Sequence, residues 1–232
     1  MNLDEFARYR YRTRVRQPAP LDASTTALVL IDCQECLRPD ELRAEWANRT
    51  DLDPADLEPA FREMDAYLDE TLVNIGRVLS ACRAAGIRPI HVRIGSQLAD
   101  SADSCAMHKR SNTRFPPGSR GGAFMPPATP LPGEMVIQKT CSGAVTGSNL
   151  DYTLRNLGIK SVIVVGFYTD QCVSGTVRDL ADLNYYVCLP SDATAAMSRE
   201  RAAHELELID KIYVVCESTD HLVARIDALP RP

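Results

Sequence analysis

Three residues with reactive side chains stand just beyond apolar, strand-like runs of the chain. Asp32 follows a run that begins at Ala27, Lys139 follows a second run, and Cys172 lies six residues after a third run that ends at Gly166. A thiolate is a strong nucleophile near neutral pH, a carboxylate can accept the thiol proton, and an ammonium can stabilise developing negative charge. If these side chains meet, they specify acyl transfer through a thioester.

Cys172 also stands where a helix is expected to begin. Apolar residues recur after it at helical spacing, at Val173, Val177, Leu180 and Leu183. The positive end of a helix dipole favours the thiolate, and the unpaired N–H groups of a first turn can bind an oxyanion. A lone Asp, Lys or Cys is more often a turn residue, a solvated charge or a buried thiol, so the prediction depends on their convergence.

The elements that could bring these residues together alternate along the chain. Apolar runs predict strands over residues 27–31, 87–94, 135–138, 161–166, 185–189 and 212–216. Helical periodicity predicts helices over residues 61–82, 150–157, 173–183 and 202–209, and a short one from about 219. This order predicts a three-layer α/β/α, Rossmann-like fold with a six-stranded, mainly parallel sheet. The carboxyl ends of its strands would share one edge, where ligands bind.

We expect one domain over residues 25–232, preceded by an N-terminal arm and linker over residues 1–24. Arginines alternate with other residues from Arg8 to Arg16, so an extended arm would carry their guanidinium groups on one face. Such an arm could bind nucleic acid or another anion. The favoured interpretation is an arm that lies over an acidic neighbouring surface or subunit.

Composition excludes several classes of protein. With 26 basic and 31 acidic residues, the net charge of −5 argues against a nucleic-acid binder. No apolar run approaches the roughly 18–20 residues that cross a bilayer, and Asp4 and Glu5 do not suit a secretory signal. We therefore expect a soluble, cytoplasmic protein. Its eight cysteines, scattered through a long chain, are expected to be mostly buried free thiols.

Two alternatives to covalent catalysis remain open at this point. Cys33-x-x-Cys36 and Cys105-x-x-His108 offer a Cys₃His set for zinc, and Cys33 with Cys36 could form a redox pair. The other alternative is a non-catalytic interaction protein that uses its arginine-rich arm. The variant Cys172→Ala separates these possibilities, because only a cysteine hydrolase needs that sulfur.

Three segments resemble the isochorismatase-like cysteine hydrolase superfamily, over roughly residues 25–225. They are LVLIDCQ at 28–34, SGAVTGSNLDYTLRNLGI shortly after Lys139, and VVGFYTDQCVSGTVRDLAD at 164–182. The last is the most specific, because it joins a strand, a Gly-x-x-Thr-x-x-Cys-Val turn and a helix. The superfamily includes nicotinamidase, N-carbamoylsarcosine amidase, biuret hydrolase and ureidoacrylate amidohydrolase.

The resemblance implies a role for particular residues of this chain. Asp32 matches the family's catalytic base, Lys139 its catalytic lysine and Cys172 its nucleophile. It also implies a cis peptide between Phe167 and Tyr168, which turns the Tyr168 N–H toward the Cys172 N–H to form an oxyanion hole. The implied partners are a small amide or ureide, N-carbamoyl or biuret-like, and further copies of the chain in a dimer or tetramer.

Departures from the family pattern narrow the expected activity. Nicotinamidases carry an Asp-x-His metal site after the second strand, whereas this chain reads HVRIGSQ from His91 to Gln97. We therefore expect no catalytic metal and no cofactor. Isochorismatases of siderophore pathways lack the cysteine, so Cys172 favours amide chemistry, with vinyl-ether or other non-amide hydrolysis as the alternative.

The substrate pocket is expected to be built by residues 36–60 and 95–134. Leu37 replaces an aromatic residue of the family at the pocket floor. Other candidate wall residues are Trp46, Arg110, Arg114 and Phe124.

Overall fold

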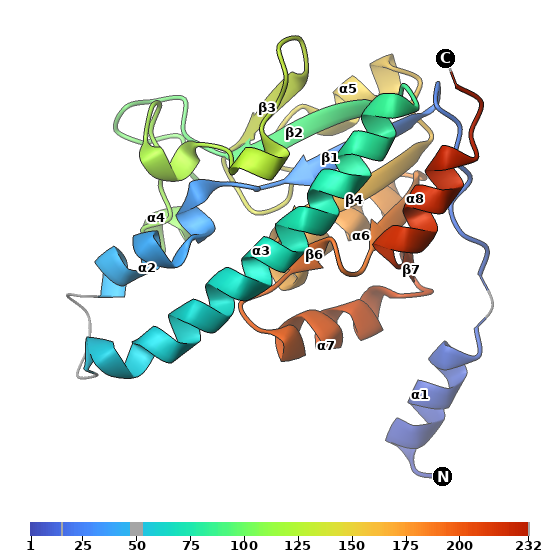
Figure 1. Cartoon of the computed structure of the whole chain (residues 1–232), viewed down its shortest axis with the longest axis horizontal. Coiled ribbons are helices and arrows are strands. Elements are labelled where there is room, and N and C mark those ends of the chain that lie inside the picture. Colours follow the sequence, from blue (N-terminus) through green and yellow to red (C-terminus); the bar gives the residue numbers. More distant parts are fainter. Residues whose placement is uncertain (15, 47–52, 232) are drawn as a thin grey trace.

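A parallel sheet forms the centre of the molecule (Figure 1). The computed structural model describes residues 1–14, 16–46 and 53–231. The strands of this described part run in the order β3-β2-β1-β4-β5-β7, and β6 pairs with β4. Their bounds are β1 Thr26–Ile31, β2 Arg88–Ile94, β3 Met135–Lys139, β4 Ser161–Phe167, β5 Tyr186–Pro190, β6 Thr194–Ala195 and β7 Val215–Glu217. All of these ladders are parallel.

The predicted α/β/α fold is confirmed, with one strand more than expected. β6 spans two residues, too few to give a recognisable apolar run. β7 begins at Val215 rather than at 212, because the chain turns there and the Lys211 N–H donates to the Val214 carbonyl at 2.7 Å.

Helices cover both faces of the sheet. Their bounds are α1 Leu3–Arg12, α2 Pro39–Trp46, α3 Pro54–Ala84, α4 Ala106–Arg110, α5 Leu150–Asn156, α6 Ser174–Asp182, α7 Arg199–Ile209 and α8 Thr219–Asp227. The long helix α3 starts earlier than predicted, because the Asp53 side chain accepts a hydrogen bond from the Ala55 N–H and Pro54 suits a first turn. Among the described residues, no helix combines the length and apolar character needed to cross a membrane.

Alternate residues of β1 belong to two separate cores, as expected of a strand covered on both faces. Leu28 and Leu30 pack in the cluster that contains residues of α3 and α8. Ala27, Val29 and Ile31 pack in the cluster that contains residues of α5, α6 and α7. Figure 1 shows α3 and α8 crossing one face of the sheet, with α5 and α6 behind it.

The long excursion after β2 is fastened to the end of β1. It contains α4 and two 3₁₀ turns, at residues 120–122 and 126–128. Gln34 is fully buried, and its side chain accepts a hydrogen bond from the Ile94 N–H at 2.8 Å and donates to the Ile94 carbonyl at 2.9 Å. The backbones of Gln34 and Phe124 form an isolated antiparallel β-bridge, and the Glu35 N–H donates to the Ala123 carbonyl. This segment is thereby held against the carboxyl edge of the sheet.

The arginine-rich arm is helical over Leu3–Arg12, so the expectation of an extended arm is wrong for this part of it. Asn2 and Glu5 form a capping box, in which each side chain accepts a hydrogen bond from the other residue's N–H. A helix rotates about 100° per residue, so successive arginines of this series, which are two residues apart, lie on opposite faces. The chain joins the body at Ala19, which is buried, and at Pro20, whose carbonyl accepts a hydrogen bond from Ser161 Oγ at 2.6 Å.

Candidate active site

Asp32 and Cys172 lie beyond the ends of the neighbouring strands β1 and β4, where the sheet order reverses direction. Strands β2 and β3 lie on one side of β1, and β4, β5 and β7 on the other. Asp32 has a positive φ of 50°, and its N–H donates to the Val92 carbonyl at 2.8 Å. Cys172 lies in a single π-helical turn, Thr169–Val173, that leads into α6. Such a switch point is where ligands bind in open α/β sheets.

Gly166 permits the close approach of β1 and β4 just before the site. Its φ is +118°, and an added Cβ would lie 2.0 Å from the Ile31 carbonyl oxygen. A side chain at this position would push β1 and β4 apart. The peptide bond between Phe167 and Tyr168 is cis, as the family resemblance implies.

Lys139 reaches the same point from the end of β3, two strands away from β1. Neighbouring strands lie roughly 4.8 Å apart, so only a long side chain can cross the end of β2. The ammonium of Lys139 lies 2.8 Å from Asp32 Oδ2 and donates hydrogen bonds to Cys172 Sγ at 3.4 Å and to the Cys141 carbonyl at 3.1 Å. The structure thus brings the three predicted residues together.

Burial controls the protonation of this group. Burial, and then the negative charge of Asp32, raise the pKa of Cys172 to about 12. Burial also raises the pKa of Asp32, against the opposing effect of Lys139. Burial disfavours the charged form of Lys139, but Asp32 and Cys172 more than offset this, and the net shift of its pKa is upward. Burial thus favours a thiol at Cys172 and opposes the stabilisation of the thiolate that a helix N-terminus provides.

Asp32 is placed to act as a base. Its Oδ1 is buried and has no hydrogen-bond partner within the described residues. A carboxylate with a raised pKa and an unoccupied oxygen can take the proton of a neighbouring thiol.

Ser142 belongs to the site, although the sequence interpretation missed it. Its Oγ lies 3.4 Å from Cys172 Sγ. Residues 139–142 thus supply the ammonium, the Cys141 carbonyl that accepts from it and a hydroxyl beside the sulfur. The signal was present, because Ser142 opens the second family-like segment.

A cavity of about 530 Å³ opens onto the sulfur. Asp32, Cys172, Tyr168 and Gln171 line it from the sheet edge. The other walls come from some of the residues in the segments 36–42 and 107–115, together with Ile94, Ser142, Phe167 and Met197. A space of this size suits a small molecule.

The candidate wall residues have different outcomes. Leu37 lines the cavity, whereas Arg110 and Arg114 do not. Phe124 packs against His91 instead, with ring centroids 5.7 Å apart. The side chain of Trp46 and residues 47–52 lie outside the described part of the chain.

The candidate zinc ligands do not form a cluster. Cys33 is buried, and its thiol points to the Ile31 carbonyl at 3.7 Å, whereas Cys36 and His108 line the cavity. Across residues 1–14, 16–46 and 53–231, no group of three or more potential ligands could hold a metal ion. All eight cysteines are free, including Cys33 and Cys36.

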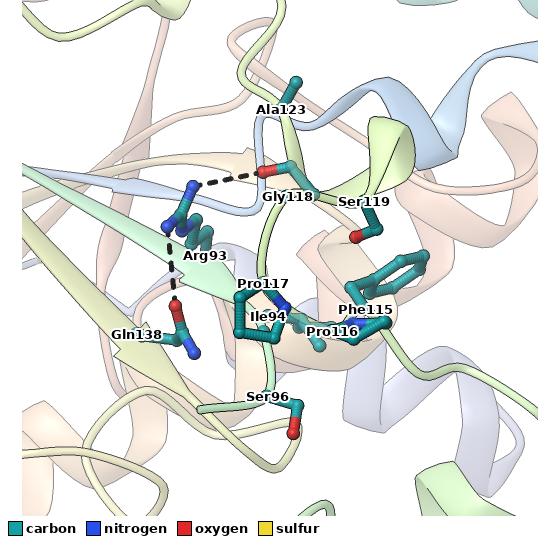
Figure 2. A pocket seen from close by; sticks show the side chains of 12 residues that line it. Arg93, Ile94, Ser96, Phe115, Pro116, Pro117, Gly118, Ser119, Ala123 and Gln138 are labelled. Carbon is teal, nitrogen blue, oxygen red and sulfur yellow. Dashed lines mark hydrogen bonds between the residues drawn. The ribbon is translucent and has the colours of Figure 1, made fainter. Parts of the chain in front are cut away.

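A second, smaller cavity of about 210 Å³ lies beside the first and shares Ile94 and Phe115 with it. Figure 2 shows Arg93 in its wall, where the guanidinium donates to the Gln138 side chain and to the Gly122 carbonyl, both at 3.4 Å. Neither Asp32 nor Cys172 lines this cavity. The reactive group belongs to the larger one.

Comparisons with known proteins bear on the family and the fold of this chain. The isochorismatase domain model matches residues 26–221. The ureidoacrylate amidohydrolase RutB of Variovorax paradoxus is 30% identical over 204 residues, which cover 77% of this chain and 71% of that protein. The crystal structure of a cysteine hydrolase from Pseudomonas syringae pv. phaseolicola has a TM-score of 0.72 at 20% identity, covering 92% of this chain and 97% of the other.

The N-carbamoylsarcosine amidase structure from Thermoplasma acidophilum has a TM-score of 0.60 at 22% identity, covering 84% of this chain and 97% of the other. At these identities the two structural likenesses show a shared fold. The domain model matches most of the chain, and one relative is 30% identical to it. These two findings establish the family. The chain belongs to the isochorismatase family.

Proposed function

We propose that this protein is a cysteine amidohydrolase that cleaves a C–N bond of a small carboxamide or ureide without a metal ion. The observation that carries the proposal is the position of the Lys139 ammonium, which contacts both the Asp32 carboxylate and the Cys172 sulfur beside one cavity. A buried carboxylate, ammonium and thiol at one point are the groups that nucleophilic acyl transfer requires.

In the proposed reaction, Asp32 takes the Cys172 proton as the sulfur attacks the substrate carbonyl carbon. The oxyanion that forms accepts hydrogen bonds from the backbone N–H groups of Tyr168 and Cys172, while Lys139 offsets the negative charge. Asp32 then returns the proton to the leaving nitrogen, and ammonia or an amine departs. Water attacks the resulting thioester, gives its proton to Asp32 and releases the acid, and the thiol is restored.

The relatives support the type of bond. Several are named ureidoacrylate amidohydrolases, and they match most of this chain. The size of the cavity supports a small substrate. An N-carbamoyl or biuret-like compound fits the type of bond, because it carries a ureido carbonyl bonded to nitrogen. It also fits the cavity, because it is small.

Ammonia release from a panel of primary amides and ureides tests the proposal. Cys172→Ala should abolish turnover, and Asp32→Asn should lower kcat by at least about 100-fold, because general base catalysis contributes about 10²–10⁴. A slow substrate should leave wild-type protein heavier by the mass of one acyl group. Cys216 lies on strand β7, away from the cavity. The variant Cys216→Ala is therefore the matched control and should retain activity. Unchanged ammonia release by Cys172→Ala would contradict the proposal.

A further inference from the structure

The hydroxyl of Ser142 contacts the sulfur that acts as the nucleophile of the proposed reaction. Its Oγ lies 3.4 Å from Cys172 Sγ, and both residues line the larger cavity. The sulfur has a second donor within reach, the Lys139 ammonium, also at 3.4 Å. The reaction proposed for this site uses the ammonium and leaves the hydroxyl without a role.

Ser142 is held near the sulfur by the segment that follows β3. The Ala144 N–H donates to Thr176 Oγ1 at 3.1 Å, and this hydroxyl in turn donates to the Cys172 carbonyl at 2.6 Å. Ala144 and Thr176 are both fully buried. Two hydrogen bonds thus connect the chain just after Ser142 with the backbone of Cys172. The backbone of Ser142 cannot move away from the sulfur without disturbing them.

The direction of the hydrogen bond between Ser142 and Cys172 depends on the protonation of the sulfur. A hydroxyl can both donate and accept, so beside a thiol either atom can be the donor. A thiolate has no proton and can only accept. Once Asp32 has taken the thiol proton, a hydrogen bond at this contact must run from the Ser142 O–H to the sulfur.

A buried thiolate needs such donors. Only 6% of the surface of Cys172 is exposed, and burial is the main reason that the pKa of this thiol rises to about 12, whereas the contact with Ser142 acts in the opposite direction. Hydrogen bonds to ionised groups are stronger than those between neutral groups, so the hydroxyl stabilises the thiolate more than the thiol. The ammonium of Lys139 is shared, because it also contacts Asp32 and the Cys141 carbonyl.

We infer that Ser142 is a further catalytic residue, whose hydroxyl donates a hydrogen bond to the Cys172 thiolate as Asp32 takes the thiol proton. In this step the S–H bond breaks, its electron pair stays on the sulfur, and its proton moves to a carboxylate oxygen. Ser142 keeps its own proton throughout. The hydroxyl lowers the cost of forming the nucleophile, and the same hydrogen bond favours departure of the sulfur when water opens the thioester. This inference rests on the proposed function.

The reactivity of the sulfur toward methyl methanethiosulfonate tests this inference without a substrate. The thiolate attacks the reagent, methanesulfinate leaves, and Cys172 becomes a methyl disulfide. Mass spectrometry of the peptide that contains Cys172, after acid quenching and peptic digestion, measures this reaction separately from those of the other cysteines. Between about pH 7 and 9 the thiolate is the minor form, so the rate is proportional to its fraction.

Ser142→Ala should slow this reaction. Losing a hydrogen bond to a charged group should lower the thiolate fraction by about 10- to 100-fold. A more basic thiolate is also a better nucleophile, which recovers about half of the effect on a logarithmic scale, so we expect a rate about 3- to 10-fold lower at each pH. Ser142→Thr keeps the hydroxyl and should restore most of the rate.

Ser148→Ala is the matched control. Ser148 lies in the same segment as Ser142, and its Oγ donates to the Ala144 carbonyl at 2.6 Å. Removing this hydroxyl takes a hydrogen bond from the segment but leaves the donor to the sulfur in place, so the rate should stay close to that of the wild type. Equal slowing in both variants would attribute the effect to the backbone of the segment and overturn the role of the Ser142 hydroxyl. Denaturant midpoints establish that each variant is folded.

Ammonia release connects the inference with catalysis. On an amide or ureide that the wild type cleaves, Ser142→Ala should lower kcat/KM and Ser142→Thr should regain it, in parallel with the reactivity of the sulfur. Unchanged reactivity of Cys172 in Ser142→Ala would overturn the role of Ser142 and leave the proposed function standing. Ammonia release that persists in Cys172→Ala would instead overturn the proposed function and, with it, the catalytic role of Ser142, whatever the reactivity of the sulfur.

Discussion

Lys139 is fully buried although its ammonium is charged. Removing a charge from water costs several kcal/mol, which a well-placed partner must offset. Asp32 supplies the opposite charge, and the Cys141 carbonyl and Cys172 sulfur accept hydrogen bonds. The contacts that make the burial of Lys139 tolerable are thus the ones that place it beside the reactive sulfur.

Removing Lys139 alone should therefore destabilise the fold. Lys139→Met leaves the buried Asp32 carboxylate without its partner, and we expect a loss of about 3–5 kcal/mol in the free energy of unfolding, measured by urea titration. Asp32→Asn combined with Lys139→Met removes both charges and should regain most of this stability while remaining inactive. Asn suits the positive φ of residue 32.

An exposed ion pair provides the matched control. Arg199 and Glu70 approach to 2.6 Å, but their side chains are 56% and 63% exposed. Arg199→Met should change the free energy of unfolding by less than about 1 kcal/mol. If Lys139→Met proves as stable as the wild type, Lys139 does not offset the cost of burying the Asp32 carboxylate.

At the scale of elements, the site depends on how β1 and β4 are joined at their carboxyl ends. The backbone of Gly166 approaches the Ile31 carbonyl more closely than any side chain allows, and the chain then turns through Phe167 and Tyr168 into the π-helical turn. This arrangement places Cys172 opposite Asp32. The relative position of Cys172 and Asp32 therefore depends on the packing of β1 against β4, and neither strand fixes it alone.

Gly166→Ala should disrupt this pair of strands. An added Cβ would lie 2.0 Å from the Ile31 carbonyl oxygen, at a φ of +118° that L-residues rarely adopt. We expect a loss of more than about 4 kcal/mol in the free energy of unfolding, or no soluble protein. Gly175→Ala, in α6 with nothing within 4 Å of the added Cβ, should be neutral or up to about 1 kcal/mol stabilising. Comparable denaturant midpoints for the two variants would contradict this account.

For the whole molecule, buried ionisable groups couple stability to pH. His91 and His108 are both buried, and burial lowers the pKa of each. Glu134 accepts hydrogen bonds from Arg83 and contacts His91 at 3.0 Å; the Arg83 contact is the main reason that its pKa falls to about 2. In each case the folded chain holds protons less tightly than the unfolded chain.

The part of the free energy of unfolding that these three groups contribute should therefore decrease as the pH falls, whereas Asp32, whose pKa burial raises, contributes in the opposite direction. The unfolded histidines protonate near pH 6.5 and the folded ones at lower pH, so their contribution is present above about 6.5 and is lost below it. The contribution of Glu134 is lost in a lower window, from about 4.5 toward 2. Between pH 7 and 5 each histidine can contribute a slope of at most about 1.4 kcal/mol per pH unit.

Urea unfolding at several pH values checks this prediction. His91→Gln should flatten the slope between pH 7 and 5, whereas His204→Gln, on the exposed surface of α7, should not. An equal dependence on pH in His91→Gln and the wild type would contradict it. The dimer or tetramer implied by the family resemblance stays a prediction, which light scattering on the purified protein can test.

Much of the architecture could be predicted because apolar periodicity reports burial directly. Residues 161–166 read as a strand buried on both faces, and Gly86, which has a φ of 77°, marks the point where α3 has ended. The arm was misjudged for a specific reason. Alternation of arginines describes a strand, but the Asn2–Glu5 capping box acts locally and favours a helix.

The sequence by itself predicted the fold class, the edge of the sheet where the candidate site lies and Asp32, Lys139 and Cys172 as its candidate residues. These follow from strand order and residue type, which are local properties of the chain. Only the tertiary structure shows that burial and the charge of Asp32 raise the pKa of the sulfur, and that Ser142 and His108 line the same cavity. Protonation depends on burial and on charges brought together by folding, and the lining of a cavity depends on which side chains of distant segments face one another.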